Sequence, residues 1–365
     1  MKIRELSSFL ESVAPIGYQE DYDNSGLIVG EPDLEISSAI ISLDCTEAVV
    51  DEAIEKGCNI VISHHPIVFK GLKKFNRKTY VERVVMKAIK HDIALYAIHT
   101  NLDHVKNGVN AELCRRLGIK DTVILSPKSG MLRKLVTFVP LEYAERIRAA
   151  LFDAGAGEIG KYSQCSFNTR GSGTFKGNEG TNAFAGKPGE LHTEAEIRIE
   201  TIFPVNIERQ LLVALLESHP YEEVAYDIYD VKNAYAQVGA GMIGNIDEAM
   251  DERDFLMQAK KNLGLSVVRH TDLRGKKVRR VAVCGGSGGF LLPRAIAAGA
   301  DVFITADYKY HEFFDAEGKI IIADIGHFES EQFTQQLLYD IITKKFPNFA
   351  LHLTEVKTNP INYII

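Results

Sequence analysis

The chain has 365 residues, of which 45% are hydrophobic and 25% are charged, and its formal net charge at pH 7 is −7. A chain of this length and apolar content can bury a large core, and we expect two domains. The acidic balance argues against a dedicated nucleic-acid-binding protein, and no apolar run reaches the roughly 20 residues that span a bilayer.

The first third alternates between predicted helices and strands. Residues 3–14 carry apolar side chains at helical spacing and predict an amphipathic helix, and a turn-forming cluster follows at 21–26. Asp23 and Asn24 belong to that cluster, and we interpret them as turn residues although a role in a site stays open. Further strands are expected at 39–43, 59–62 and 93–98, and further helices at 46–57, 81–89 and 110–117. This alternation predicts a largely parallel sheet.

Two adjacent histidines stand at the end of one predicted strand. Ser63-His64-His65-Pro66 follows the β-branched run 59–62 directly. In an open α/β sheet, the carboxyl end of the strands is where ligands and metals bind. A pair of ordinary loop histidines is the alternative, so the pair alone does not decide between them.

The middle of the chain has a different pattern. Strands are expected at 132–140, 196–204 and 224–231 and helices at 142–153 and 207–217, whereas the Gly-rich stretch 155–189 shows little periodicity beyond short strand candidates. Thr137-Phe138-Val139-Pro140 followed by a helix recurs as Thr201-Ile202-Phe203-Pro204 followed by a helix. The order β-α-β-β-α-β is the ferredoxin-like arrangement. We therefore predict a ferredoxin-like α+β domain at 130–233, inserted into a discontinuous α/β domain of residues 1–129 plus 234–365.

The last third repeats the order of the first. Strands are expected at 278–283, 301–305 and 319–325, with a helix at 291–298. We interpret the two thirds as a pseudo-duplication, in which two α/β halves face each other and supply ligands to one site. The polar residues Asp307, His311 and Glu312 occupy the loop where His64 and His65 lie in the first half. Two other features are interpreted as structural: the basic cluster 274–280 as a solvated loop, and Gly285–Gly289 as a tight turn rather than a phosphate cradle.

A His-x-x-x-carboxylate motif follows one predicted strand in each half. The two motifs are His99 to Asp103 and His327 to Glu331. An imidazole and a carboxylate four residues apart lie on one side of a helical turn, so both can reach one cation. Together with the histidine pair, these motifs predict one shared metal site.

The donor types restrict the metal and the chemistry. Histidines and carboxylates without cysteine suit Zn²⁺, Mn²⁺, Fe²⁺ or Ni²⁺ and disfavour Ca²⁺. Glu331 is the carboxylate that we expect to bridge two ions, roughly 3.5–4 Å apart in two-metal hydrolysis. Such ions lower the pKa of bound water to about 7, which makes hydrolysis feasible in neutral solution.

The five cysteines occur singly and form no Cys-x-x-Cys pair. The sequence therefore predicts neither a disulfide framework nor a thiolate zinc site, which is typical of a reducing compartment. Residues 1–15 lack the apolar core of a signal peptide. We expect a soluble, cytoplasmic protein.

Taken together, the motifs resemble the Nif-three-like family, whose members are often described as GTP cyclohydrolase type 2 homologues. The resemblance rests on Ser-His-His-Pro at 63–66, His-Thr-Asn-Leu-Asp at 99–103 and Gly-His-Phe-x-Ser-Glu at 326–331. It extends over the whole chain, through Asp23-Asn24-x-Gly26-Leu27 and, in the expected insert, the segments 177–182 and 219–223. Tyr22 stands where the family usually has tryptophan.

The resemblance implies a centre of two divalent metal ions per subunit, Zn²⁺ first among the candidates, and gives His99 a neighbouring acid–base role. The implied ligands are His64, His65, Asp103, His327 and Glu331. It also implies a toroidal homohexamer with the metal sites facing an internal cavity, and a middle domain similar to the PII/CutA type.

Two functions stay open at this stage. The first is a metal-dependent hydrolase that acts on a purine ring carbon, as in GTP ring opening, or on a phosphoester. The second is a non-catalytic metal-binding or regulatory scaffold, because fold and metal site do not specify chemistry. A nucleic-acid-binding role ranks third, because the net charge is negative, and no membrane partner is expected.

Overall fold

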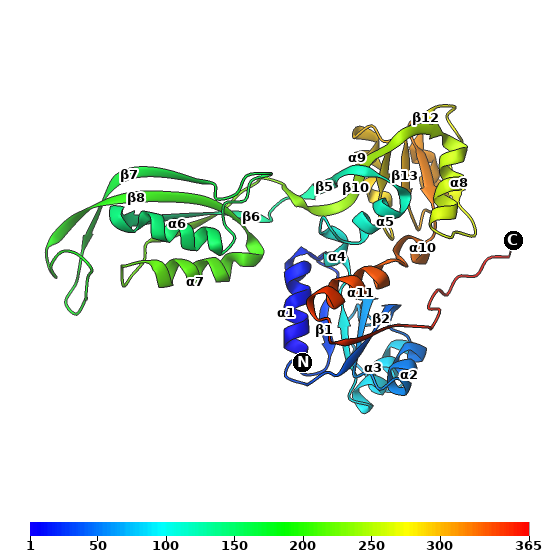
Figure 1. Ribbon diagram of the computed structural model, residues 1–365, viewed down its shortest axis with the longest axis horizontal. Helices are drawn as coiled ribbons and strands as arrows, with labels where there is room; N and C mark the ends of the chain where they lie inside the picture. Colours follow the sequence, from blue (N-terminus) through cyan, green and yellow to red (C-terminus); the bar gives the residue numbers. More distant parts are fainter. Residues whose placement is uncertain (365) are drawn as a thin grey trace. The chain divides into compact units, whose positions relative to one another are not determined.

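The computed structural model describes residues 1–364, and the chain divides into two compact units (Figure 1). One unit comprises Met1–Pro127 and Gln237–Ile365, and the other comprises Lys128–Ala236. The α/β class predicted from the sequence is confirmed. No helix of the described chain is both long and apolar enough to cross a membrane.

The first sheet of the larger unit has five strands in the order β1-β4-β3-β2-β15. Neighbouring strands are parallel except β1, which is antiparallel to β4. Alternate residues of these strands pack on opposite layers: Ile62 lies with α1 and α11, whereas Val61 lies with α2 and α3. The strands are β1 (Gly26–Val29), β2 (Ser38–Asp44), β3 (Ile60–His65), β4 (Ala94–Ala97) and β15 (Ala350–Leu353).

The second sheet of this unit has six strands in the order β11-β14-β13-β12-β10-β5. Strands β12, β13 and β14 are parallel, and β10 and β11 run antiparallel to their partners β12 and β14. Helices α5 and α8 pack on one face and α9 on the other. The strands are β5 (Lys120–Lys128), β10 (Tyr235–Asp251), β11 (Arg269–His270), β12 (Lys277–Val283), β13 (Val302–Thr305) and β14 (Ile321–Asp324).

The helices of the larger unit agree with the sequence pattern where it made a prediction. Thr46 caps α2 by accepting a hydrogen bond from the Val49 N–H at 3.3 Å, and Gly118 ends α5 in the left-handed conformation. The α-helices are α1 (Ile3–Val13), α2 (Glu47–Glu55), α3 (Tyr80–Lys90), α4 (Thr100–His104), α5 (Val109–Leu117), α8 (Glu252–Asn262), α9 (Leu292–Ala297), α10 (His327–Glu331) and α11 (Thr334–Lys345). Short 3₁₀ helices are η1 (Ile16–Tyr18), η4 (Gly289–Leu291) and η5 (Tyr310–Ala316).

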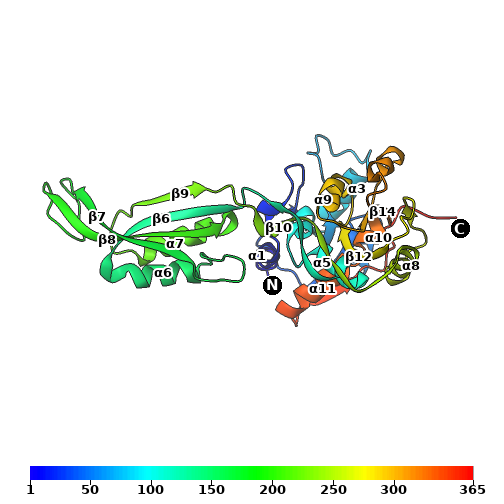
Figure 2. The ribbon, with the colours of Figure 1, turned by 90° about the horizontal axis from the view of Figure 1, so that it is seen from above.

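The smaller unit is an antiparallel sheet in the order β7-β8-β6-β9. Helices α6 and α7 lie on one side of it, over a core that includes Leu135 and Phe203 (Figure 2). Its elements are β6 (Leu132–Pro140), η2 (Leu141–Tyr143), α6 (Ala144–Asp153), β7 (Ser166–Lys176), β8 (Leu191–Pro204), η3 (Val205–Ile207), α7 (Glu208–Ser218) and β9 (Tyr226–Asp230).

The structure differs from the sequence prediction at the Gly-rich stretch and at the basic cluster. The Gly-rich stretch 155–189, expected to hold only short strands, contains the 11-residue strand β7. In the basic cluster 274–280, expected to be a solvated loop, the Arg274 guanidinium is buried between Glu252 at 3.3 Å and Asp301 at 3.2 Å. Arg274 therefore joins its loop to the start of α8 and to the residue before β13, and its guanidinium is not available to an anionic partner.

Candidate metal centre

The six predicted side chains come together within the larger unit. His64 and His65 end β3, His99 precedes α4, which carries Asp103, and the short helix α10 begins at His327 and ends at Glu331. Three overlapping groups among them have ligand atoms within 4.8 Å of one another and could hold a metal ion: His64, His65 and His99; His65, His327 and Glu331; and His64, Asp103 and Glu331.

Glu331 lies at the centre of the cluster. Its Oε2 is 3.0 Å from His65 Nε2, 3.1 Å from His327 Nε2 and 4.0 Å from His64 Nε2. Burial alone would raise the pKa of this carboxyl, but the hydrogen bonds with His327 and His65 hold it well below its usual range. One ionised oxygen therefore faces imidazoles from both ends of the chain.

Two buried polar atoms in the cluster lack a hydrogen-bond partner. They are His64 Nε2 and Asp103 Oδ1, which lie 3.6 Å apart. The His64 Nδ1–H donates to the Ile98 carbonyl at 2.8 Å, which leaves the lone pair of Nε2 directed into the cluster. Burial lowers the pKa of His64 to about 3, so its imidazole is neutral and can act as a ligand. A cation satisfies both orphaned atoms, so the residues present fit a metal ion.

Burial and the neighbouring charge of Glu331 act together on Asp103. Both raise the pKa of Asp103 well above its usual range. The low pKa of Glu331 and the high pKa of Asp103 show that the site holds one negative charge more easily than two. A bound cation would reverse this preference because it stabilises the second carboxylate.

Three of the histidines are oriented by an acid on the other ring nitrogen. His65 Nδ1 contacts Asp44 at 2.8 Å, His327 Nδ1 contacts Asp307 at 2.7 Å, and His99 Nδ1 contacts Asp23 at 2.7 Å. A carboxylate on Nδ1 fixes the ring and leaves Nε2 for a metal or a proton, as in metal sites generally.

Sequence reasoning missed or misinterpreted these three acids. The sequence pattern does not single out Asp44, places Asp307 only in a polar loop, and explains Asp23 by turn chemistry while leaving a role in a site open. Asp23 does cap its turn, by accepting from the Asn24 N–H at 2.7 Å, but it also accepts from the Thr100 N–H at 3.0 Å. The available signal was position, because Asp44 ends β2 of the first sheet and Asp307 follows β13 of the second, as His64 and His65 end β3 and His327 follows β14.

His65 and His327 hold protons tightly when no cation is present. Burial opposes protonation of His65, but hydrogen bonds to Asp44 and Glu331 outweigh it and raise its pKa to about 10. For His327, burial is likewise outweighed, by Glu331 and Asp307, and its pKa rises to about 9. Binding of a cation therefore requires these protons to leave.

The glycine loop after β12 packs against the cluster. The N–H groups of Gly285, Gly286 and Gly288 donate at 2.9 Å to Asn110, Ser330 and Thr305, respectively. Gly286 has a φ of +62°, and a Cβ there would lie 2.4 Å from Glu331 Oε1. These contacts agree with the tight-turn interpretation, because these three amides donate hydrogen bonds to protein side chains and are not free to bind a phosphate.

A cavity of about 990 Å³ opens over the cluster. The aromatic side chains of Tyr22, Phe69 and Phe290 line it, as do C-terminal residues 358–361. Neither lysine nor arginine appears among the described residues of its wall. His311, which sequence position placed beside the site, instead packs against the exposed ring of Tyr310.

A model of the Duf34/NIF3 (NGG1p interacting factor 3) family matches residues 1–360. The chain belongs to the Duf34/NIF3 family. The family resemblance predicted from the motifs is thereby confirmed.

Relatives in the Duf34/NIF3 family cover the chain from end to end. The "GTP cyclohydrolase 1 type 2 homolog" of Bacillus subtilis is 38% identical over 99% of this chain and 98% of its own length. The protein of the same name from Halalkalibacterium halodurans is 39% identical over 97% of this chain and 96% of its own. A crystal structure of a Bacillus cereus protein related to NIF3 superposes with a TM-score of 0.87 at 38% identity, covering 100% of this chain and 99% of that one.

Proposed function

We propose that this chain is a metal-dependent hydrolase with two divalent ions in the larger unit, Zn²⁺ first among the candidates. The observation that carries the proposal is the convergence on Glu331 Oε2 of imidazoles from β3 and α10, next to the orphaned atoms of His64 and Asp103. The residues that would hold the ions are His64, His65, Asp103, His327 and Glu331.

Divalent ions at this site would supply Lewis-acid activation of water and substrate at neutral pH. The protein's own contribution to proton transfer falls to His99. Its ring centroid lies 5.3 Å from those of His64 and His65, and its Nδ1 is held by Asp23. This arrangement fixes the tautomer and leaves Nε2 to take or give a proton at the cavity.

The cavity wall favours a ring substrate over a simple phosphoester. Phosphate sites usually present arginine or lysine to the anion, and the described wall of this cavity has neither, so the phosphate groups of a nucleotide would have to extend beyond this wall. Aromatic side chains such as Phe69, whose ring meets His99 edge-on at 5.6 Å, offer surfaces on which a purine can stack. The name of the relatives supports the same choice, with hydrolytic opening of the GTP base as the reaction to test first.

The finer architecture is part of the same proposal. We assign residues 130–233 to a ferredoxin-like insert of the PII/CutA type and residues 1–129 plus 234–365 to one metal-binding domain made of two pseudo-repeated halves. In support, β2-β3-β4 and β12-β13-β14 are both parallel triplets that lead into a His-x-x-x-carboxylate helix. A cytoplasmic, toroidal homohexamer is the proposed assembly.

A non-catalytic scaffold is the second candidate. The observation that favours it is the separate core of the smaller unit, which gives the chain a second body able to bind a small molecule or another subunit. In that case the metal would organise the larger unit without turnover.

Metal analysis followed by a turnover assay separates these functions. We expect about two equivalents of divalent metal in freshly purified protein and hydrolysis of GTP in preference to generic phosphoesters. His64→Ala should lower metal content and turnover together, whereas His91→Ala, at an exposed histidine directly after α3, should change neither. Metal without turnover of any tested compound would favour the scaffold, and the absence of bound metal would overturn the proposed site.

A further inference from the structure

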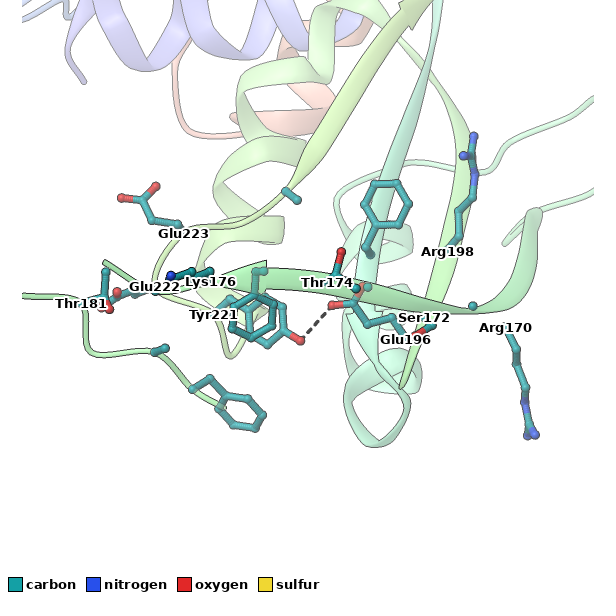
Figure 3. Close-up of a pocket in the computed structure, with 18 of the residues that line it drawn as sticks. Arg170, Ser172, Thr174, Lys176, Thr181, Glu196, Arg198, Tyr221, Glu222 and Glu223 are labelled. Carbon is teal, nitrogen blue, oxygen red and sulfur yellow. Dashed lines mark hydrogen bonds between the residues drawn. The ribbon is translucent and has the colours of Figure 1, made fainter. Parts of the chain in front are cut away.

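The smaller unit contains a second cavity, of about 560 Å³, away from its helices (Figure 3). Its wall is formed by β7, the loop that follows β7, β8 and the segment 221–225 after α7. A volume of this size is within the range of small-molecule sites. The proposed hydrolase function does not use this cavity.

A buried carboxylate forms the polar centre of the cavity. Glu196 on β8 is 7% exposed, and its Oε1 accepts a hydrogen bond from the Tyr221 hydroxyl at 2.9 Å (Figure 3). Within residues 1–364, no donor or cation contacts the other oxygen, Oε2. Oε2 is not one of the enclosed, unpaired polar atoms of the described chain, so it is an acceptor that is open to the cavity and available to a bound donor.

The neighbouring strand makes room for this carboxylate. A Cβ on Gly173 of β7 would lie 2.1 Å from Glu196 Oε2. Any larger residue at 173 would therefore displace the carboxylate. At Gly171, which also lines the cavity, a Cβ would meet nothing within 4 Å, so the space beside the carboxylate is open.

Aromatic rings form the wall next to the carboxylate. The Tyr221 ring centroid lies 5.7 Å from that of Phe184 and 6.0 Å from that of Phe175. The loop that carries Phe184 is fastened to the same segment, because the Glu222 carboxylate accepts from the Asn182 N–H at 3.1 Å. Three basic residues, Arg170, Lys176 and Arg198, also line the cavity, and Arg198 is paired with Glu200 at 2.9 Å. Beside the Glu196 carboxylate itself, the flat aromatic surfaces suit a planar cation, which gains both stacking and charge pairing.

We propose that this cavity binds a small planar molecule carrying an amidinium, guanidinium or protonated amino-heteroaromatic group, with its N–H groups donating to Glu196 Oε2. The aromatic wall receives the flat body of the molecule. Tyr221 holds the carboxylate in place by its hydrogen bond to Oε1.

Benzamidine and benzoate test this directly, because they share size and shape and differ in charge and in donors. We expect the full-length protein to bind benzamidine in a calorimetric titration and benzoate at least tenfold more weakly. Glu196→Gln should weaken benzamidine binding at least tenfold. Glu194→Gln, on the same strand but paired with His192 and outside the cavity, should leave it unchanged.

Two further variants keep the test decisive. Tyr221→Phe removes only the hydroxyl that positions the carboxylate and should weaken binding several-fold, so it replaces Glu196→Gln if that variant does not fold. Glu331→Gln, in the proposed metal centre, should not affect benzamidine affinity. Equal binding of benzoate, or full affinity in both Glu196→Gln and Tyr221→Phe, would overturn the proposal.

Discussion

At the scale of single residues, the proposed metal centre repeats one arrangement. An acid holds Nδ1 of a histidine, so that Nε2 points toward a shared centre, and this occurs at His65, His99 and His327. Asp44 ends β2, Asp307 follows β13 and Asp23 lies in the loop before β1, and each side chain reaches across to a histidine on another segment. The site therefore depends on residues that never contact the proposed metal ions.

Asp307 provides the sharpest test of that dependence. Asp307→Asn removes the negative charge on His327 Nδ1 but suits the backbone, because asparagine tolerates the left-handed φ of +61°. Partners of this kind typically change metal affinity by about 10–100-fold, and we expect a loss in that range by competition with a chelating indicator. Asp315→Asn, at an exposed acid of η5, the 3₁₀ helix that follows Asp307, is the control. Unchanged affinity in Asp307→Asn would show that the acid does not support the site.

The sequence predicted the ligand-type residues but not their supports, for a physical reason. His-x-x-x-carboxylate spacing is local, so helical geometry alone places His327 and Glu331 together. The contact between Asp44 and His65 arises instead from the register of two parallel strands, in which these residues are direct partners. Register is a property of the assembled sheet and cannot be read from either strand alone.

At the scale of secondary-structure elements, the C-terminal segment is fastened to α2 by one carboxylate. Glu52 is buried, and its Oε1 accepts from the Glu355 N–H at 2.9 Å and pairs with Lys56 Nζ at 2.8 Å. The Thr354 hydroxyl donates to Oε2. Farther along the same segment, the Thr358 hydroxyl donates to Asp44 at 2.7 Å. Asp44 in turn contacts His65, so the position of the C-terminal segment affects a histidine of the metal cluster.

Glu52→Gln should therefore destabilise the protein, and the loss should depend on pH. Burial would raise the pKa of Glu52, but its hydrogen bonds with Lys56, Thr354 and Glu355 lower it below the ordinary 4.5. A carboxyl group whose pKa is lower in the folded protein than in the unfolded chain stabilises the fold at pH values above the unfolded pKa. This stabilisation is lost as the pH falls through the folded-state pKa. We expect a cost of about 1–3 kcal/mol near pH 7, shrinking below about pH 4.5.

Urea denaturation of both proteins with metal removed measures this difference at each pH. Glu55→Gln, at an exposed position one turn along α2, should leave the free energy of unfolding within about 0.5 kcal/mol of wild type. A cost that stayed constant down to pH 3 would contradict the assignment, because it would not follow ionisation of Glu52.

Strong apolar periodicity predicted many of the elements, and glycine concealed two long strands, β7 and β10. The long strand β10 was not expected, since Gly239, Gly241 and Gly244 lower its strand propensity. They are required by packing: a Cβ at Gly239 would lie 2.2 Å from the Ser126 carbonyl oxygen, and one at Gly244 would lie 2.4 Å from that of Lys120. A close approach of two backbones is visible only in the folded sheet.

At the scale of the whole molecule, the two units have separate cores. The hydrophobic cluster under α6 and α7 draws only on residues of Lys128–Ala236, and the other clusters in the described chain draw only on residues outside that range. Each unit therefore buries its own apolar surface and has what an independent folding unit requires.

We expect the fragment 128–236 to fold alone and the remainder to keep its metal. The chain ends left by the deletion lie close together, because residue 239 packs directly on residue 126, so a short Gly-Ser linker can join 127 to 237. The fragment should unfold in one cooperative urea transition and bind benzamidine as tightly as the full-length chain does. The linked remainder should contain as much metal as the full-length chain. A fragment with poorly dispersed amide resonances, or a remainder without metal, would show that the two cores depend on each other despite their separate packing.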